Sequence, residues 1–97
     1  MATEPLVTLA SRVSIGDDVA FRDLDGELVL LNLRTGVYFG LDPIGTRIWH
    51  LLRDGQPLEA VVAALVAEYE VSESRCTADV LDFVGLLREH ALVDVAR

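Results

Sequence analysis

NLRTGVYFGLDPIGTRIW, residues 32–49, contains the transition from strands to helices around which the chain is organised. Its first part, residues 37–41 (VYFGL), is a strand-like run without charge, and we expect it to form the edge of a sheet. Edge strands are usually protected by Lys, Pro or a bulge, because their free N–H and C=O groups recruit any extended chain. This run lacks such protection. We therefore predict that it is a docking slot for a peptide, with helices behind it forming the wall of a groove.

Two hairpins are predicted before and within this region. Residues 19–24 and 27–33 flank Asp25-Gly26, a strong hairpin signal because both turn positions need positive φ. The second hairpin turns at residues 34–36 (RTG), whose glycine can supply the left-handed residue of a three-residue loop. This order makes the second strand the middle one and leaves the first and third strands as edges.

The register of these hairpins predicts which side chains face the helices. It places Phe21 opposite Leu30, and Leu31 opposite Phe39. One face then carries Leu24, Val29, Leu31, Leu33, Val37, Phe39 and Leu41. The other face carries Val19, Phe21, Leu28, Leu30 and Tyr38. Because the first face is richer in large apolar side chains, we expect it to pack against the helices.

Three helices are predicted after the strands. Asp42-Pro43 provides an N-cap and a proline at the first helical position, and Gly55 ends this first helix, whose apolar stripe is Ile44, Ile48, Leu51 and Leu52. Pro57 opens a second helix, with an apolar stripe at Leu58, Val61, Val62, Leu65, Val66 and Tyr69. Ser72 can cap a third helix, with a stripe at Cys76, Val80, Phe83, Val84, Leu87 and Ala91. Strands followed by helices predict a small α+β domain, a three-stranded antiparallel sheet followed by three α-helices.

Length and composition limit the function. The 97 residues, of which 52% are hydrophobic, suffice for one domain, which we place at residues 19–97 after a partly ordered N-terminal tail, residues 1–18. The net charge of −8, from 16 acidic and 8 basic residues, disfavours nucleic acid as a partner and suits a cationic peptide or protein. The single cysteine, Cys76, excludes an intramolecular disulfide and favours a cytoplasmic setting. No signal peptide or membrane span is predicted, and we expect a monomer.

The sequence offers little for catalysis. His50 and His90 lie on different helices without metal-ligand spacing, and both are expected at the surface. Cys76 has no evident base beside it and is expected to be a small buried residue. No glycine pattern forms a nucleotide-binding loop. We therefore predict that the protein is not an enzyme and uses no metal or cofactor.

Several segments together resemble the PqqD family, also known as the RiPP precursor recognition element, which includes the stand-alone leader-binding proteins of lasso-peptide pathways. The resemblance covers residues 19–95. It lies in the order and spacing of LVLLNLRTGVYFGLDPIGTRIWHLL (28–52), Asp54-Gly55, Leu65, Tyr69, Asp79-Val80, Phe83-Val84 and Leu87. This sequence departs from the family pattern at Ala91, where family members often have glycine before Leu92.

The resemblance implies a winged-helix-like domain that binds the leader segment of a ribosomally made precursor peptide. In the family, the leader adds as a strand beside the third strand and presses side chains into a groove between that strand and the third helix. The peptide ladder is then expected at Val37, Tyr38, Phe39, Gly40 and Leu41. Candidate pocket residues are Val80, Phe83, Leu86 and Leu87, and candidate polar anchors are Arg75 and Asp79. A separate modifying enzyme, such as a leader protease or cyclase, is the expected second partner.

Each candidate has an alternative structural role. Val80, Phe83 and Leu87 lie on the core stripe of the third helix and can be packing residues, whereas Leu86 lies off the stripe, so its exposure would favour a role in binding. Asp79 could instead pair with Arg75 four residues earlier.

Two alternative functions also stay open: a winged-helix DNA-binding regulator, which the acidic charge disfavours, and a small enzyme, which the lack of a nucleophile–base pair disfavours.

Overall fold

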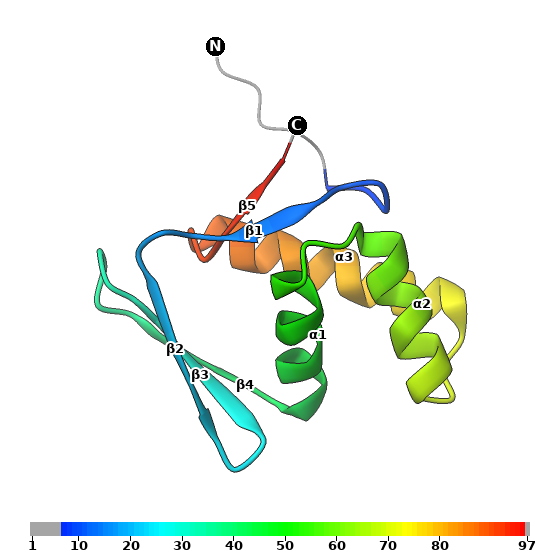
Figure 1. Ribbon diagram of the computed structural model, residues 1–97, viewed down its shortest axis with the longest axis horizontal. Helices are drawn as coiled ribbons and strands as arrows, with labels where there is room; N and C mark the ends of the chain where they lie inside the picture. The colour runs from blue at the N-terminus through cyan, green and yellow to red at the C-terminus, as the bar shows by residue number, and fades with distance from the viewer. Residues whose placement is uncertain (1–6, 97) are drawn as a thin grey trace.

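The computed structural model describes residues 7–96, so residues 1–6 of the predicted N-terminal tail, and residue 97, lie outside the description. Strands β2 (Val19–Leu24), β3 (Glu27–Asn32) and β4 (Tyr38–Leu41) form an antiparallel sheet in the order β2-β3-β4. Helices α1 (Pro43–Arg53), α2 (Leu58–Glu68) and α3 (Glu73–Glu89) follow (Figure 1). The predicted α+β class, with β3 in the middle and β2 and β4 at the edges, is confirmed.

A second, two-stranded sheet joins the two ends of the described chain. Strand β1 (Val13–Ile15) pairs antiparallel with β5 (Val93–Val95), and the two lie side by side above the helices in Figure 1. Residues just before β1 also bind the start of α2, because the N–H groups of Leu58 and Glu59 donate to the carbonyls of Ser11 and Leu9. The segment preceding β2 therefore supports α2 and the end of α3. A domain boundary at residue 19 stays a prediction.

The first hairpin and the helix caps follow the local sequence signals. Asp25 and Gly26 both have positive φ, 53° and 85°, and Phe21 pairs with Leu30 as predicted. Asp42 caps α1 by accepting the Gly45 N–H at 2.7 Å, and Ser72 caps α3 by accepting the Arg75 N–H at 3.3 Å. Both caps satisfy N–H groups that a helix start leaves without intrahelical partners.

The predicted register of the second hairpin is wrong by one residue. Phe39 pairs with Leu30, and Tyr38 pairs with Leu31. The reason is the Asn32 side chain, whose Oδ1 accepts the N–H groups of Arg34 and Thr35, at 3.0 and 3.3 Å, and thereby lengthens the loop to residues 33–37. Asn32 Nδ2 donates to the carbonyl of His90 at 3.0 Å and ties the hairpin to the end of α3.

The predicted assignment of the sheet faces is also wrong for most positions. Leu28 and Leu30 are fully buried beneath the helices, together with Leu41 and part of Phe39. Because neighbouring residues of a strand point to opposite faces, Val29 and Leu31 lie on the outer face, away from the helices. Leu24, Leu33 and Val37, assigned to the inner face from the sequence, are exposed instead. The register error explains this, because it placed Phe39 and Leu41, which do face the helices, on the same face as Val29 and Leu31.

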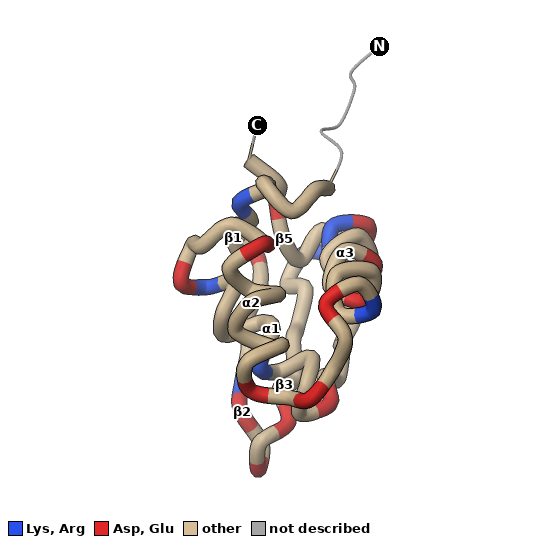
Figure 2. The backbone as a smooth tube through the Cα atoms, turned by 90° about the vertical axis from the view of Figure 1, so that its right-hand side faces the viewer, with Lys and Arg blue, Asp and Glu red and all other residues tan. Residues whose placement is uncertain are grey.

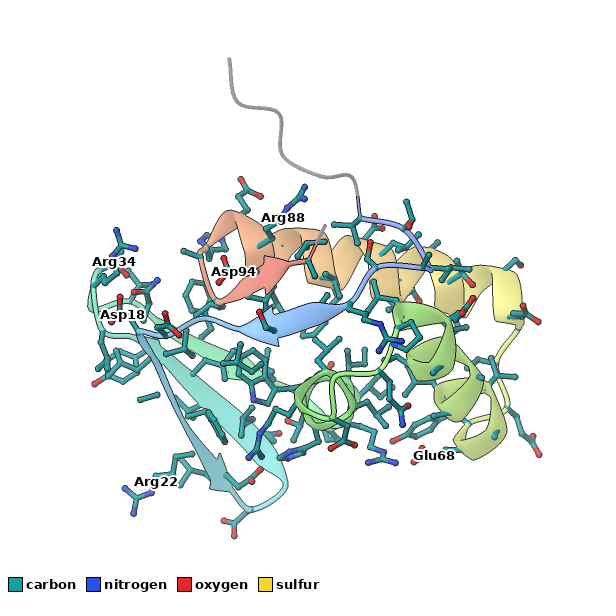
Figure 3. The ribbon with its side chains drawn as sticks, turned by 45° about the horizontal axis from the view of Figure 1, so that its top comes forward. Asp18, Arg22, Arg34, Glu68, Arg88 and Asp94 are labelled. Atoms are coloured by element: carbon teal, nitrogen blue, oxygen red, sulfur yellow. The ribbon has the colours of Figure 1, made fainter. Side chains whose placement is uncertain are left out.

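The core lies between this sheet, the three helices and the β1–β5 pair. Trp49 is fully buried, and its ring contacts that of Phe21 edge-on, with centroids 5.9 Å apart. The other large, fully buried side chains include Leu28, Leu30, Leu52, Leu58 and Leu92. A bidentate pair of Arg47 with Glu68, whose shortest N–O distance is 2.9 Å, links α1 to the last turn of α2, and Figure 3 labels Glu68 there.

Thr46 completes the ladder where β4 ends and α1 begins. Its buried hydroxyl accepts the Leu28 N–H at 3.0 Å and donates to the Leu41 carbonyl at 3.3 Å. The hydroxyl therefore stands between two backbone groups that a regular ladder would pair directly. This bridge fixes the first turn of α1 against the end of β4.

Ala91 has a left-handed backbone, with φ of 57°, at the position where α3 ends. Glycine adopts this conformation without the steric cost that a Cβ brings. We expect Ala91→Gly to raise the free energy of unfolding by roughly 0.5–1 kcal/mol, measured by urea denaturation. The matched control is Ala78→Gly, in the exposed interior of α3, which should lower it by a similar amount. Equal losses in both variants would contradict the strain at Ala91.

Candidate functional site

The outer edge of β4 is the first element of the candidate site. The Asn32 N–H donates to the Val37 carbonyl at 3.0 Å, which fixes Val37 as a residue whose backbone points toward β3. Because antiparallel strands alternate in this respect, Phe39 and Leu41 also point toward β3, whereas Tyr38 and Gly40 direct their N–H and C=O groups outward. No strand formed by residues 7–96 pairs with this edge. The edge thus offers a short row of donors and acceptors to an added strand.

A hollow of about 340 Å³, here called the larger hollow, lies between β4, α1 and α3. Seven of the eleven predicted site residues line it: Phe39, Gly40, Leu41, Asp79, Phe83, Leu86 and Leu87. Leu86 is 50% exposed. Exposure at this position, off the core stripe of α3, favours the predicted role in binding. The free edge and an apolar hollow therefore lie next to each other.

A smaller hollow of about 120 Å³ continues beyond it, between α1, α2 and α3. The two remaining predicted α3 residues, Arg75 and Val80, line this hollow together with Asp79. Val80 itself is almost fully buried. Ile44, Ile48 and Asp79 line both hollows. The two hollows therefore form one groove that starts beside β4 and runs along α3.

Two predicted residues lie outside the groove. Val37 belongs to the loop at residues 33–37, and its side chain is exposed. The Tyr38 side chain is 69% exposed and borders a shallow hollow on the outer face of the sheet, next to Val29 and Leu31. Only the backbone of Tyr38 therefore belongs to the candidate site.

Ile44, Tyr69 and His90 are among the groove residues that sequence reasoning missed. Ile44 is 51% exposed at the second position of α1, although helical spacing had assigned it to a core stripe. Tyr69 follows α2 and lines the smaller hollow. The ring of His90 lies 4.7 Å from that of Phe39 and closes the larger hollow near the end of α3. A proline at the start of α1, which directs the chain away from β4, was the available signal for Ile44.

The groove contains little that could carry out a reaction. Burial, and secondarily the charge of Asp79, raises the pKa of the Cys76 thiol, so this group stays protonated and is a poor nucleophile at neutral pH. The Asp42 carboxylate is engaged as the cap of α1. Within residues 7–96 no three His, Cys, Asp or Glu side chains are grouped so that they could hold a metal ion.

The charge of the surface is mainly acidic. Figure 2 shows red positions along α3 and at the tip of the β2–β3 hairpin, with fewer blue ones. Helix α3 itself carries four acidic and two basic residues: Glu73, Asp79, Asp82 and Glu89 against Arg75 and Arg88. The helices that the structure describes include none both long and apolar enough to cross a bilayer.

Comparisons with known proteins agree with this geometry. Residues 27–93 match the profile of the family described as coenzyme PQQ synthesis protein D (PqqD). A solved structure of TbiB1 in complex with the TbiA(beta) leader peptide superposes with a TM-score of 0.80 at 44% sequence identity, covering 82% of this chain and 93% of that chain. A lasso peptide synthetase B1 complexed with the leader peptide gives a TM-score of 0.80 at 27% identity, covering 84% and 96%. A comparison with curated proteins gives no match.

These findings confirm the resemblance inferred from the sequence. They give no support to the alternative of a winged-helix DNA-binding regulator. The acidic charge of α3 also argues against DNA binding, since a helix that enters a DNA groove needs clustered Lys and Arg.

Proposed function

Because this chain belongs to the PqqD family, we propose that it binds the leader segment of a ribosomally synthesised precursor peptide and delivers it to a separate modifying enzyme, without catalysing a reaction itself. Support comes from the two similar solved structures, each of which is a complex with a leader peptide. The 44% identity to TbiB1 extends over most of both chains. A leader peptide is therefore the partner that we assign to this chain.

The observation that carries the proposal is the free edge of β4 beside the groove. A leader that adds as a strand gains hydrogen bonds from the outward N–H and C=O groups of Tyr38 and Gly40. Its alternate side chains then reach the larger hollow, where Phe83 and Leu86 form the opposite wall. Affinity comes from the main chain in this mode, and specificity comes from the hollow.

The contribution to a reaction is positional. With a protonated Cys76 thiol and no base identified beside it, the groove can accelerate chemistry only by holding the precursor near an enzyme. The segment to be modified is then present at an effective concentration on the order of millimolar for a short flexible connection. The enzyme, for example a leader protease or a cyclase, is a separate chain in this proposal. The free protein is expected to be a monomer in the cytoplasm.

Leu86→Ala tests the groove directly. The probe is the synthetic TbiA(beta) leader peptide, titrated against the 15N-labelled protein. In the wild type we expect the largest changes in amide chemical shift at Tyr38, Gly40 and the groove side of α3. Truncating Leu86 should weaken binding by about 1–2 kcal/mol, because it removes apolar contact area from the wall of the hollow.

The matched control is Leu24→Ala. Leu24 is a leucine of almost the same exposure, 52%, but it lies on the outer face of the sheet. Its truncation should leave the affinity unchanged, and both variants should keep the wild-type melting temperature. Shifts confined to β2, or equal losses in the two variants, would place the peptide elsewhere.

A further inference from the structure

Asp79 lies at the junction of the two hollows. It is the only charged residue among those that line both, since the two others shared by them are Ile44 and Ile48. Among residues 7–96, no hydrogen bond or ion pair joins its carboxylate to another side chain, and Arg75, one turn earlier, does not pair with it. A carboxylate without a partner thus stands where a peptide would pass from the larger hollow to the smaller one.

The other charged groups of the groove leave this position acidic. Asp42, at the β4 end of the larger hollow, is engaged with the N–H of Gly45. His90 lines the larger hollow, where its ring contacts that of Phe39 at an interplanar angle of 51°, and Arg75 borders only the smaller hollow. The net charge of −8 adds an attraction for cations over the whole molecule. A neutral or acidic ligand residue at the junction would leave Asp79 unpaired and partly dehydrated.

We propose that Asp79 selects leader peptides that carry a lysine or arginine between two apolar side chains. The basic residue pairs with the Asp79 carboxylate, and the apolar residues on either side of it fill the two hollows. This inference rests on the proposed function and adds the chemical class of leader that the groove accepts. It extends the binding site beyond the end of β4, because the smaller hollow is lined by residues of α1, α2, α3 and the α2–α3 connection and by no strand.

The physical reason is the apolar wall around the carboxylate. A peptide that fills both hollows displaces water from Ile44 and Ile48, and this strengthens the attraction between the ligand cation and Asp79. The same desolvation penalises a ligand carboxylate at the junction, so the groove discriminates against acidic peptides as well as favouring basic ones. The smaller hollow is lined largely by apolar side chains, such as Ile44, Leu65 and Val80, and therefore suits an apolar side chain.

A displayed library of random peptides, selected on the purified wild-type protein, tests this inference. We expect enrichment of Lys or Arg flanked by apolar residues. Selection on Asp79→Asn should lose the preference for a basic residue, and selection on Asp79→Arg should replace it with a preference for Asp or Glu. An enriched lysine peptide, made synthetically, should bind Asp79→Asn about fivefold more weakly than the wild type, whereas its norleucine analogue should bind both equally.

Asp82→Asn is the matched control, because it removes the same charge from the exposed surface of the same helix at a position that lines neither hollow. It should keep the wild-type preference. Enriched peptides without a basic residue, or a preference that persists in Asp79→Asn, would overturn the role of Asp79 and leave leader binding intact. A library from which no peptide is enriched would refute leader binding itself, and the inference with it.

Discussion

Replacing Tyr38 by proline is expected to abolish leader binding while the protein stays folded. The Tyr38 N–H points to the free edge, so proline removes a donor that the β3–β4 ladder does not use. The pyrrolidine ring also occupies the place of the incoming strand. We expect the affinity for the TbiA(beta) leader peptide to fall by more than roughly 2 kcal/mol, from the lost hydrogen bond and the steric conflict together. Calorimetric titration measures this change, and circular dichroism checks the fold.

Two further variants separate backbone from side chain. Tyr38→Ala keeps the N–H and removes an exposed ring on the outer face, so its affinity should match the wild type. Phe39→Pro removes an N–H that points toward β3 and a side chain in the groove, so it should destabilise the sheet. Strong binding by Tyr38→Pro would show that the leader does not add as a strand to β4.

The largest expected loss of stability from a single hydroxyl is at Thr46. Thr46→Val keeps the shape of the side chain but removes the hydroxyl that binds the Leu28 N–H and the Leu41 carbonyl in the core. We expect the free energy of unfolding to fall by about 2–3 kcal/mol, because a buried donor without an acceptor loses its hydration and gains nothing. Urea denaturation measures the change.

Thr46→Ser is the control for this variant. It keeps the hydroxyl and loses one methyl group, which should cost about 1 kcal/mol. If the valine variant were as stable as the serine variant, the hydroxyl bridge between β3 and β4 would have no energetic role. Peptide affinity is a second readout, since the bridge fixes the end of the strand to which the leader is proposed to add.

Features that depend on neighbouring residues were predictable from the sequence. Asp25-Gly26 needs two positive φ angles, and Asp42-Pro43 needs a cap followed by a residue without an N–H, so each signal is complete within a few positions. The order β2-β3-β4 followed from these signals. The unprotected edge followed in turn, because it required only the absence of charge and of Lys or Pro in residues 37–41.

Features that depend on a side chain binding the backbone, or on distant contacts, were not predictable in this way. The register of the second hairpin is set by Asn32, whose side chain binds both its own loop and the carbonyl of His90. A one-residue change of register exchanges the faces of a strand, which is why the predicted inner face was wrong. Ile44 was assigned to the core for a similar reason, since only the positions of α2 and α3 decide that the first turn of α1 is left partly uncovered.

The pairing of β1 with β5 also has a consequence for how the domain folds. Residues from opposite ends of the described chain must meet before this sheet exists, and the Asn32–His90 hydrogen bond similarly joins a hairpin to the end of α3. Contacts of high sequence separation slow folding, because the chain loses the entropy of closing a long loop before it gains the favourable energy of the contact. Local elements such as the β2–β3 hairpin can form early. We therefore expect the two sides of the groove, β4 and α3, to acquire their final spacing late in folding, so that a partly folded chain offers an exposed strand edge without the hollow that makes it selective.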